Sequence, residues 1–142
     1  MAQVIIYTNS TGGVSVCVPT GELDIQAVKA KDTPADSIIV DDSSLPQGSD
    51  AQFFDAWELA NNVVAVNIIK AIALQQAALN SIAKTEAQHR ATNTSIGLNN
   101  QLSDADWLAL ITTARTAIGS ATTTQELLDA VTPVQAAITA NA

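Results

Sequence analysis

Residues 53–72 read FFDAWELANNVVAVNIIKAI and contain the point at which the hydrophobic pattern of the chain changes. Two β-rich runs, 53–59 and 63–66, flank the pair Asn61-Asn62, and asparagine tolerates the left-handed conformation that a tight hairpin requires. From Asn67 onward the pattern changes to a helical period of about 3.5 residues, and the stripe that follows it is apolar in its first half and polar in its second half until Ile96. The stretch therefore predicts a β-hairpin that leads directly into a long helix.

The predicted long helix covers residues 67–97, and a stripe with alternating spacings of four and three residues runs along it. Gly97 is a natural stop, because glycine readily adopts the left-handed conformation that ends many helices. A helix of this length must bury its stripe against another element. Either the later helices fold back onto it, or two copies of the chain pair as a coiled coil. In the second case the self-association residues are Ile68, Ile72, Leu79 and Ile82.

The residues before the hairpin predict a small β-rich module with one helix. Runs 4–8 and 14–18 flank a turn that contains two glycines, which is typical of a hairpin. Residues 22–31 have helical spacing, and residues 37–41 form a third β-branched run. We therefore expect an N-terminal antiparallel hairpin-and-helix module at residues 1–66.

The residues after Gly97 predict a short helical bundle. A variant of the capping box at Ser103 opens a helix over 103–118, which carries Trp107. Two further helices are expected at 124–131 and 133–140, the second with proline at its first position. The predicted fold is thus α+β, with a helical C-terminal module at residues 67–142.

The charge of the chain excludes some classes of partner. The 142 residues carry a net charge of −8, and residues 1–66 contribute nine acids against two lysines. Nucleic acids and anionic membranes bind clustered Lys and Arg, so we expect neither as a partner. Lys70, Gln75 and Gln76 interrupt the longest apolar stretch, which argues against a transmembrane helix. Residues 67–142 have few charges to keep helix surfaces soluble, which suggests that a partner covers part of them.

The sequence contains no recognisable catalytic or cofactor motif. Nucleotide-binding glycine loops, the zinc-protease motif and the serine-hydrolase motif are all missing from it. His89 is the only histidine and Cys17 the only cysteine, and neither has a catalytic partner at a suitable spacing. Asp41-Asp42 lacks the ligand pattern of a calcium loop. We expect a binding protein without cofactor or metal; an enzyme acting on cell-surface glycan or peptide, with these paired acids, is the alternative.

The order of several short motifs resembles small proteins encoded beside tail-fibre genes in tailed bacteriophages. Residues 53–59, a short turn, residues 63–67 and Lys70-Ala71 carry the clearest part of the resemblance. Two further segments agree, in the same order along the chain. The first consists of Pro34, residues 38–41 and Leu45-Pro46. The second is 112–133, in which Thr124-Gln125-Glu126-Leu127 precedes the final proline. The chain departs from this pattern after Lys70-Ala71, where the family is rich in Arg and Lys. An apolar or amide-based interface is therefore expected here.

The resemblance implies a function in fibre assembly. The expected role is a tail-fibre assembly chaperone that binds the fibre protein and assists its trimerisation in the host cytoplasm. A permanent virion component, such as a fibre or baseplate adaptor or cap, is the alternative. The expected partner-facing residues are Phe53, Phe54, Trp57, Leu59 and Trp107. For the first four, the alternative is that they form the core of the N-terminal sheet.

Overall fold

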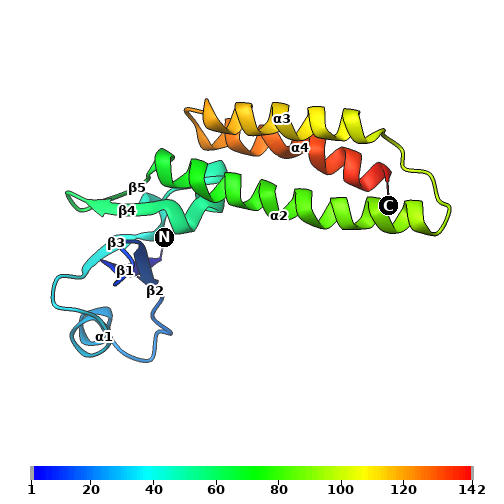
Figure 1. Cartoon of the computed structure of the whole chain (residues 1–142). Coiled ribbons are helices and arrows are strands. Elements are labelled where there is room, and N and C mark those ends of the chain that lie inside the picture. The colour runs from blue at the N-terminus through cyan, green and yellow to red at the C-terminus, as the bar shows by residue number, and fades with distance from the viewer. Residues whose placement is uncertain (1, 142) are drawn as a thin grey trace. The chain divides into compact units, whose positions relative to one another are not determined.

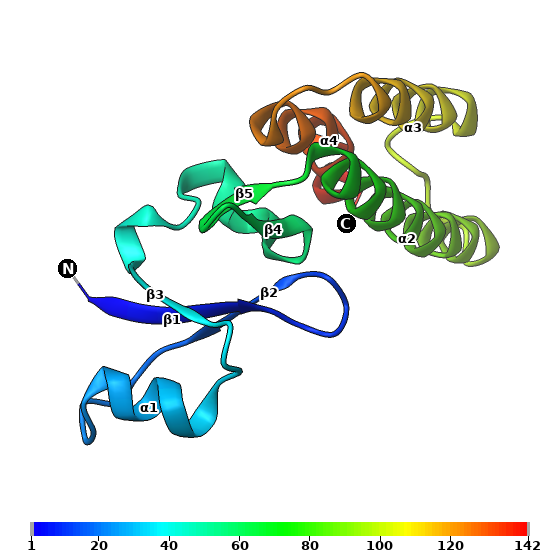
Figure 2. The same cartoon turned by 90° about the vertical axis from the view of Figure 1, so that its left-hand side faces the viewer.

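The computed structural model describes residues 2–141 and has the mixed α+β fold that the sequence predicts (Figures 1 and 2). The chain divides into two compact units, Met1–Asn67 and Ile68–Ala142. This boundary lies one residue after the expected one. Each unit has its own buried side chains.

The N-terminal unit is built on a three-stranded antiparallel sheet. Strand β1 (Gln3–Thr8) lies between β2 (Val14–Cys17) and β3 (Ile38–Asp41). Ile5 of β1 is opposite Cys17 on one side and Ile39 on the other. The predicted hairpin and third strand are therefore confirmed.

A helix covers one face of this sheet. Helix α1 (Ile25–Asp32) begins three residues later than expected, because Asp24 caps it by accepting a hydrogen bond from the backbone N–H of Gln26. Successive side chains of a strand point to opposite faces. Ile5 therefore faces away from Val4 and Ile6, and all three are buried. Figure 2 shows α1 on one side of the sheet and the second hairpin on the other.

The second hairpin consists of β4 (Trp57–Ala60) and β5 (Val63–Val66), and its turn is the predicted one. Asn61 and Asn62 both have positive φ, 52° and 63°, as the tight turn between right-twisted strands requires.

The expected strand over 53–59 is wrong in its first half. Phe53 to Ala56 belong to the 3₁₀ segment η2 (Gly48–Ala56), and the strand starts only at Trp57. Phe53 and Ala56 are both buried, and Phe53 marks a kink in this segment, because its φ of −106° and ψ of 45° are not helical. The indole Nε1 of Trp57 also donates a hydrogen bond of 2.9 Å to the carbonyl of Asp50. This bond ties the 3₁₀ segment to the hairpin.

The core of the N-terminal unit lies between the two sheets. Trp57 and Val64 of the hairpin pack with three residues of the larger sheet, and half-buried side chains surround them. The buried members of this core cluster are Val4, Ile6, Val14, Trp57 and Val64. The β-branched residues that alternate along the strands thus supply most of this core, and Trp57 is its one large aromatic side chain.

The second unit consists of three helices: α2 (Ile68–Ser95), α3 (Asp104–Gly119) and α4 (Thr124–Ala140). Helix α3 runs back along α2, and α4 runs forward again (Figure 1). The later helices fold back onto the predicted stripe of α2, as the first of the two arrangements requires. Leu79 is fully buried there, and Gln75 Nε2 donates a 2.9 Å hydrogen bond to the carbonyl of Leu127. Within residues 2–141, no helix is both long and apolar enough to span a membrane.

The expected break before Pro133 is wrong, because α4 is one continuous helix with this proline inside it. Proline removes the hydrogen bond to the carbonyl four residues earlier, here that of Asp129. Asp129 and Pro133 are both exposed, so water can solvate that carbonyl. Val131 and Val134 are buried on the opposite side, and their packing holds the helix together across the proline.

Candidate functional site

The structure places the expected partner-facing residues in different environments. Phe53, Trp57 and Trp107 are buried within their own units, and Leu59 is half-buried against the core of the hairpin. Phe54 differs from them, because 43% of its surface is exposed. Its ring centroid lies 4.8 Å from that of Trp57, with the two planes tilted by 59°. Phe54 is therefore an exposed aromatic side chain held in place by a buried one.

The four expected self-association residues lie on the face of α2 that its own chain covers. Leu79 has no exposed surface, and Ile68, Ile72 and Ile82 are half-buried. The stripe packs onto α3 and α4, which leaves Leu79 unavailable to a second copy. The expectation that this residue pairs two copies is corrected accordingly.

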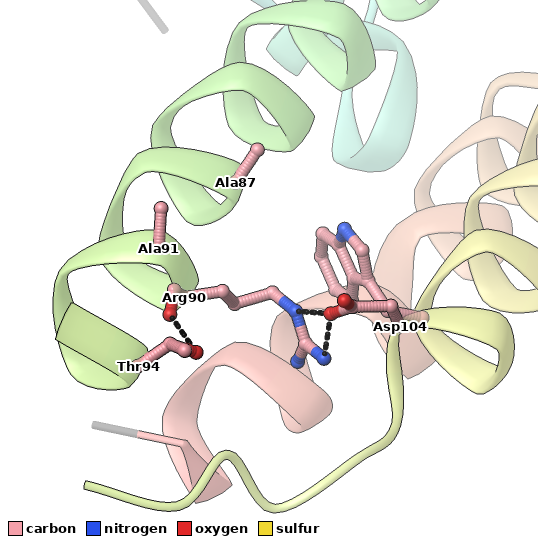
Figure 3. Close-up of a pocket in the computed structure, with 6 residues that line it drawn as sticks. Ala87, Arg90, Ala91, Thr94 and Asp104 are labelled. Carbon is pink, nitrogen blue, oxygen red and sulfur yellow. Dashed lines mark hydrogen bonds and ion pairs between the residues drawn. The ribbon is translucent and has the colours of Figure 1, made fainter. Parts of the chain in front are cut away.

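A polar cluster at one end of the helical unit was not singled out from the sequence. Its centre is Arg90, which is 5% exposed. Arg90 Nη2 donates hydrogen bonds of 2.6 Å to the carbonyl of Leu102 and 2.8 Å to Asp104 Oδ1. Figure 3 shows the contact between the Arg90 guanidinium and Asp104. The guanidinium carbon also lies 5.9 Å from the ring centroid of Trp107. One arginine thus joins α2 to the loop before α3, to the start of α3 and to a buried indole.

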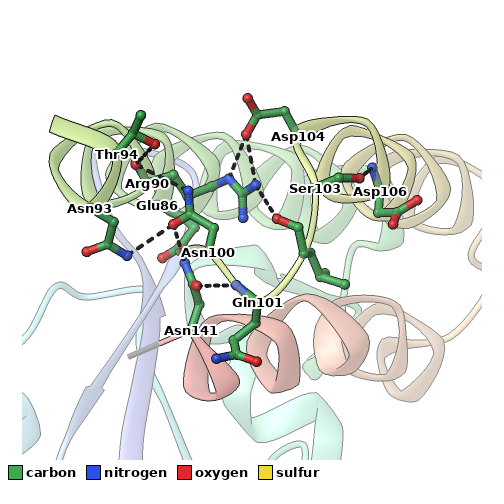
Figure 4. Close-up of polar contacts among 11 residues, drawn as sticks. Glu86, Arg90, Asn93, Thr94, Asn100, Gln101, Ser103, Asp104, Asp106 and Asn141 are labelled. Atoms are coloured by element: carbon green, nitrogen blue, oxygen red, sulfur yellow. Dashed lines mark hydrogen bonds and ion pairs between the residues drawn. The ribbon is translucent and has the colours of Figure 1, made fainter. Parts of the chain in front are cut away.

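A second group of polar contacts extends from Glu86 to the end of α4 (Figure 4). Glu86 is 4% exposed, and its Oε1 accepts a 2.8 Å hydrogen bond from Asn141 Nδ2. Asn141 Oδ1 accepts a 2.8 Å bond from the backbone N–H of Gln101. Asn93 Nδ2 donates to Asn100 Oδ1 at 3.0 Å. These bonds hold the loop after α2 against both α2 and α4. They also supply the hydrogen-bond partners that buried polar groups need.

The hydrogen bonds of the polar cluster hold the loop between α2 and α3 against the helices. Its histidine, His89, places Nδ1 3.4 Å from Glu86 Oε2. Within the described residues, no group of three or more His, Cys, Asp or Glu side chains is arranged to hold a metal ion. The thiol of Cys17 is free and half-buried in β2.

Two shallow hollows flank the Arg90–Asp104 pair. One has a volume of about 300 Å³ and opens between α2 and α3. Its lining residues are Ala87, Arg90, Ala91, Thr94, Asp104 and Trp107. The other, of about 360 Å³, lies under the loop after α2 and shares Arg90, Thr94 and Asp104 with the first. The sequence signal for this region was the polar second half of the α2 stripe, which includes Glu86 and Asn93.

The planar guanidinium of Arg90, with its several N–H donors, is expected to stabilise the helical unit. Arg90→Lys keeps the positive charge but cannot reach both the Leu102 carbonyl and Asp104 while covering Trp107, so the helical unit should lose about 1–3 kcal/mol. Urea unfolding followed by Trp107 fluorescence measures this loss. The matched control is Arg115→Lys, because Arg115 is exposed and its guanidinium donates a hydrogen bond to the side chain of Asn80. Equal stability of the two variants would show that Arg90 does not fasten the loop.

Comparison of the chain with protein-family models, with curated proteins and with solved structures gave no match.

Proposed function

We propose that the chain is a bacteriophage tail-fibre assembly chaperone that binds the fibre protein through its N-terminal unit. The observation that carries this proposal is the position of Phe54. It belongs to the segment 53–59, which has the clearest resemblance to proteins encoded beside fibre genes, and its ring is exposed against Trp57.

The surface of the N-terminal unit supports a binding role. Besides Phe54, three large aliphatic side chains of this unit are well exposed: Val18, Leu23 and Val63. An aromatic side chain held rigid by a neighbour loses little conformational freedom on binding, which is typical of the residues that dominate interfaces. A chaperone needs such side chains to cover apolar surface on an unassembled client.

The proposed client explains why a small binder is useful. Fibre chains that trimerise by pairing distant segments do so slowly and expose apolar surface and strand edges in the meantime. A binder that covers such surface in the host cytoplasm would reduce aggregation until the trimer forms. The acids of residues 1–66 would keep this binder soluble and away from nucleic acid.

Co-expression with the adjacent fibre gene tests the proposed function. We expect the fibre protein to become soluble and trimeric only when this chain is present, as measured by size-exclusion chromatography with light scattering. If the fibre protein trimerises equally well alone and never co-elutes with the chain, the chaperone proposal is wrong. Stoichiometric amounts of the chain in purified particles would instead identify a permanent virion component.

Substitution of Phe54 tests the proposed surface. Phe54→Ala should weaken binding to the fibre protein by about tenfold or more, because truncation of an aromatic anchor at an interface costs roughly 1–4 kcal/mol. Titration of the purified fibre protein by calorimetry measures the change. Ile96→Ala is the control, since this exposed aliphatic residue lies in the helical unit. If both variants bind the fibre protein with equal affinity, Phe54 is not part of the interface.

A further inference from the structure

Strand β5 of the second hairpin has backbone groups that point away from its neighbour β4. The backbone N–H of Asn67 donates a 2.8 Å hydrogen bond to the carbonyl of Ala56, so these two residues form a bonded pair. Bonded and non-bonded pairs alternate along an antiparallel ladder, which places Val64 and Val66 at non-bonded positions. Their N–H and C=O groups therefore lie along the outer edge of the hairpin. Within residues 2–141 these groups have no hydrogen-bond partner.

Strand β5 also lacks the features that usually prevent an edge strand from pairing with another chain. Such strands are commonly protected by a charged side chain, a proline or a bulge. Each of the other three edge strands of residues 2–141 contains a polar residue: Ser15 in β2, Asp41 in β3 and Glu58 in β4. The four residues of β5 are all apolar, and they pair with β4 one to one, without a bulge. This edge is therefore open to an added strand.

The two faces of β5 define the side chains that an added strand would need. Val64 is buried in the core cluster of the N-terminal unit, and Val66 is half-buried against it. Apolar side chains of an added strand would pack beside these two valines. On the other face, Val63 and Ala65 are exposed, and Ala65 is opposite Glu58. A neutral or basic side chain suits this face better than an acidic one.

The edge lies beside the aromatic side chain that we propose to bind the fibre protein. The ring of Phe54 lies 4.8 Å from that of Trp57, measured between centroids. Trp57 is in turn opposite Val66, in the pair of the hairpin that is farthest from the turn. Phe54 and the unpaired backbone of Val66 are thus at the same end of the hairpin, where one client can contact both.

We propose that β5 binds an extended segment of the fibre protein, which joins the hairpin as a third strand. This proposal rests on the proposed function and specifies how the client is recognised. Strand addition derives its affinity from main-chain hydrogen bonds and its specificity from alternate side chains. An unassembled fibre chain that exposes strand edges offers the complementary backbone groups. The segment that fits has apolar residues at every second position and neutral or basic residues between them.

The charge of the N-terminal unit disfavours a second copy of this chain as the occupant of the edge. Residues 1–66 carry nine acids against two lysines, so two such units brought edge to edge would repel each other. A neutral or basic segment of the fibre protein meets no such repulsion. The chain alone should therefore be monomeric in light scattering. A dimer that Val66→Pro dissociates would overturn the assignment of this edge to the fibre protein.

Hydrogen exchange of the full chain, alone and bound to the purified fibre protein, tests for the added strand. The outward amides of Val64 and Val66 should exchange freely in the unbound chain and at least about tenfold more slowly in the complex. Val16 is the internal control, because it holds the corresponding non-bonded position on the outer edge of β2. Its exchange should not change. A complex that leaves Val64 and Val66 unprotected would overturn the proposal, as would protection of both amides in the unbound chain.

A proline at position 66 tests the same edge through affinity. Val66→Pro removes the outward N–H but no hydrogen bond within the hairpin, and prolines are tolerated at such edge positions. Binding to the fibre protein in calorimetry should weaken at least about fivefold, because one main-chain hydrogen bond is lost. Val16→Pro is the matched control on β2 and should bind as the wild type does, with circular dichroism showing that both variants are folded.

The two proposals fail in different ways. If Val66→Pro binds the fibre protein as tightly as the wild type and Phe54→Ala does not, the added strand is wrong and the proposed function stands. Equal weakening by Val66→Pro and Val16→Pro would likewise overturn the assignment to β5. If the wild-type chain does not bind the fibre protein at all, the proposed function is wrong, and the added strand is wrong with it.

Discussion

Replacing Leu79 by alanine is expected to lower the free energy of unfolding of the helical unit by about 2–5 kcal/mol. Leu79 is the most deeply buried large side chain of α2, with no exposed surface. The change removes apolar contacts and leaves a cavity among three helices that cannot close fully around it. Stability per residue is about 0.05–0.15 kcal/mol, so a unit of 75 residues has roughly 4–11 kcal/mol in total. The variant should therefore lose a large share of its stability.

Urea unfolding of the Leu79→Ala variant measures this loss. Trp107 lies in the helical unit and the other tryptophan, Trp57, in the N-terminal unit. A Trp57→Phe background therefore makes the fluorescence report on the helical unit alone. Leu74→Ala is the control, because Leu74 lies on the same helix but is 39% exposed. If both substitutions cost the same, α2 does not bury its stripe against α3 and α4.

The sequence predicted those elements in which local chemistry and packing agree. Asn61-Asn62 and its β-rich flanks specify a two-residue hairpin, and the structure has it. The long helix was placed to within two residues, because a stripe with a helical period, apolar in its first half and polar in its second, runs up to Gly97. In both cases residues within a few positions of each other determine the conformation.

The errors arose where burial and packing override a local signal. Proline at position 133 indicated a new helix, but Val131 and Val134 are buried on the other side and keep α4 continuous. The run that starts at Phe53 has high strand propensity, yet Phe53 to Ala56 belong to the 3₁₀ segment, which the Asp50–Trp57 hydrogen bond joins to the following strand. Neither tertiary contact is encoded in the pattern of its own segment.

The candidate surfaces were predictable only in part. The aromatic segment was found from its composition, but only the structure separates exposed Phe54 from buried Phe53 and Trp57. The stripe of α2 allowed either folding back or pairing between copies, and periodicity alone does not distinguish the two. The fastening role of Arg90 depends on Leu102, Asp104 and Trp107, which are 12 to 17 residues away in the sequence. No pattern of sequence spacing predicts contacts between such residues across a loop.

Replacing Trp57 by alanine is expected to unfold much of the N-terminal unit. Trp57 is the largest member of the buried core cluster and supplies the hydrogen bond to the Asp50 carbonyl. Truncation of a buried tryptophan typically costs about 3–5 kcal/mol. At 0.05–0.15 kcal/mol per residue, a unit of 67 residues has roughly 3–10 kcal/mol of stability. The loss is therefore comparable with the whole stability of this unit.

Hydrogen exchange of the Trp57→Ala variant resolves the effect residue by residue. Amides of β1 and β4 should exchange much faster than in the wild-type chain, because both strands border the emptied core. Trp57→Phe is the matched control: it keeps an aromatic ring in the core and removes the 2.9 Å bond to Asp50, which should cost only about 1 kcal/mol. Retained protection of β1 in the alanine variant would mean that Val4, Ile6, Val14 and Val64 hold the two sheets together without the indole. Comparable losses in both variants would instead assign the stability to the hydrogen bond that anchors the 3₁₀ segment.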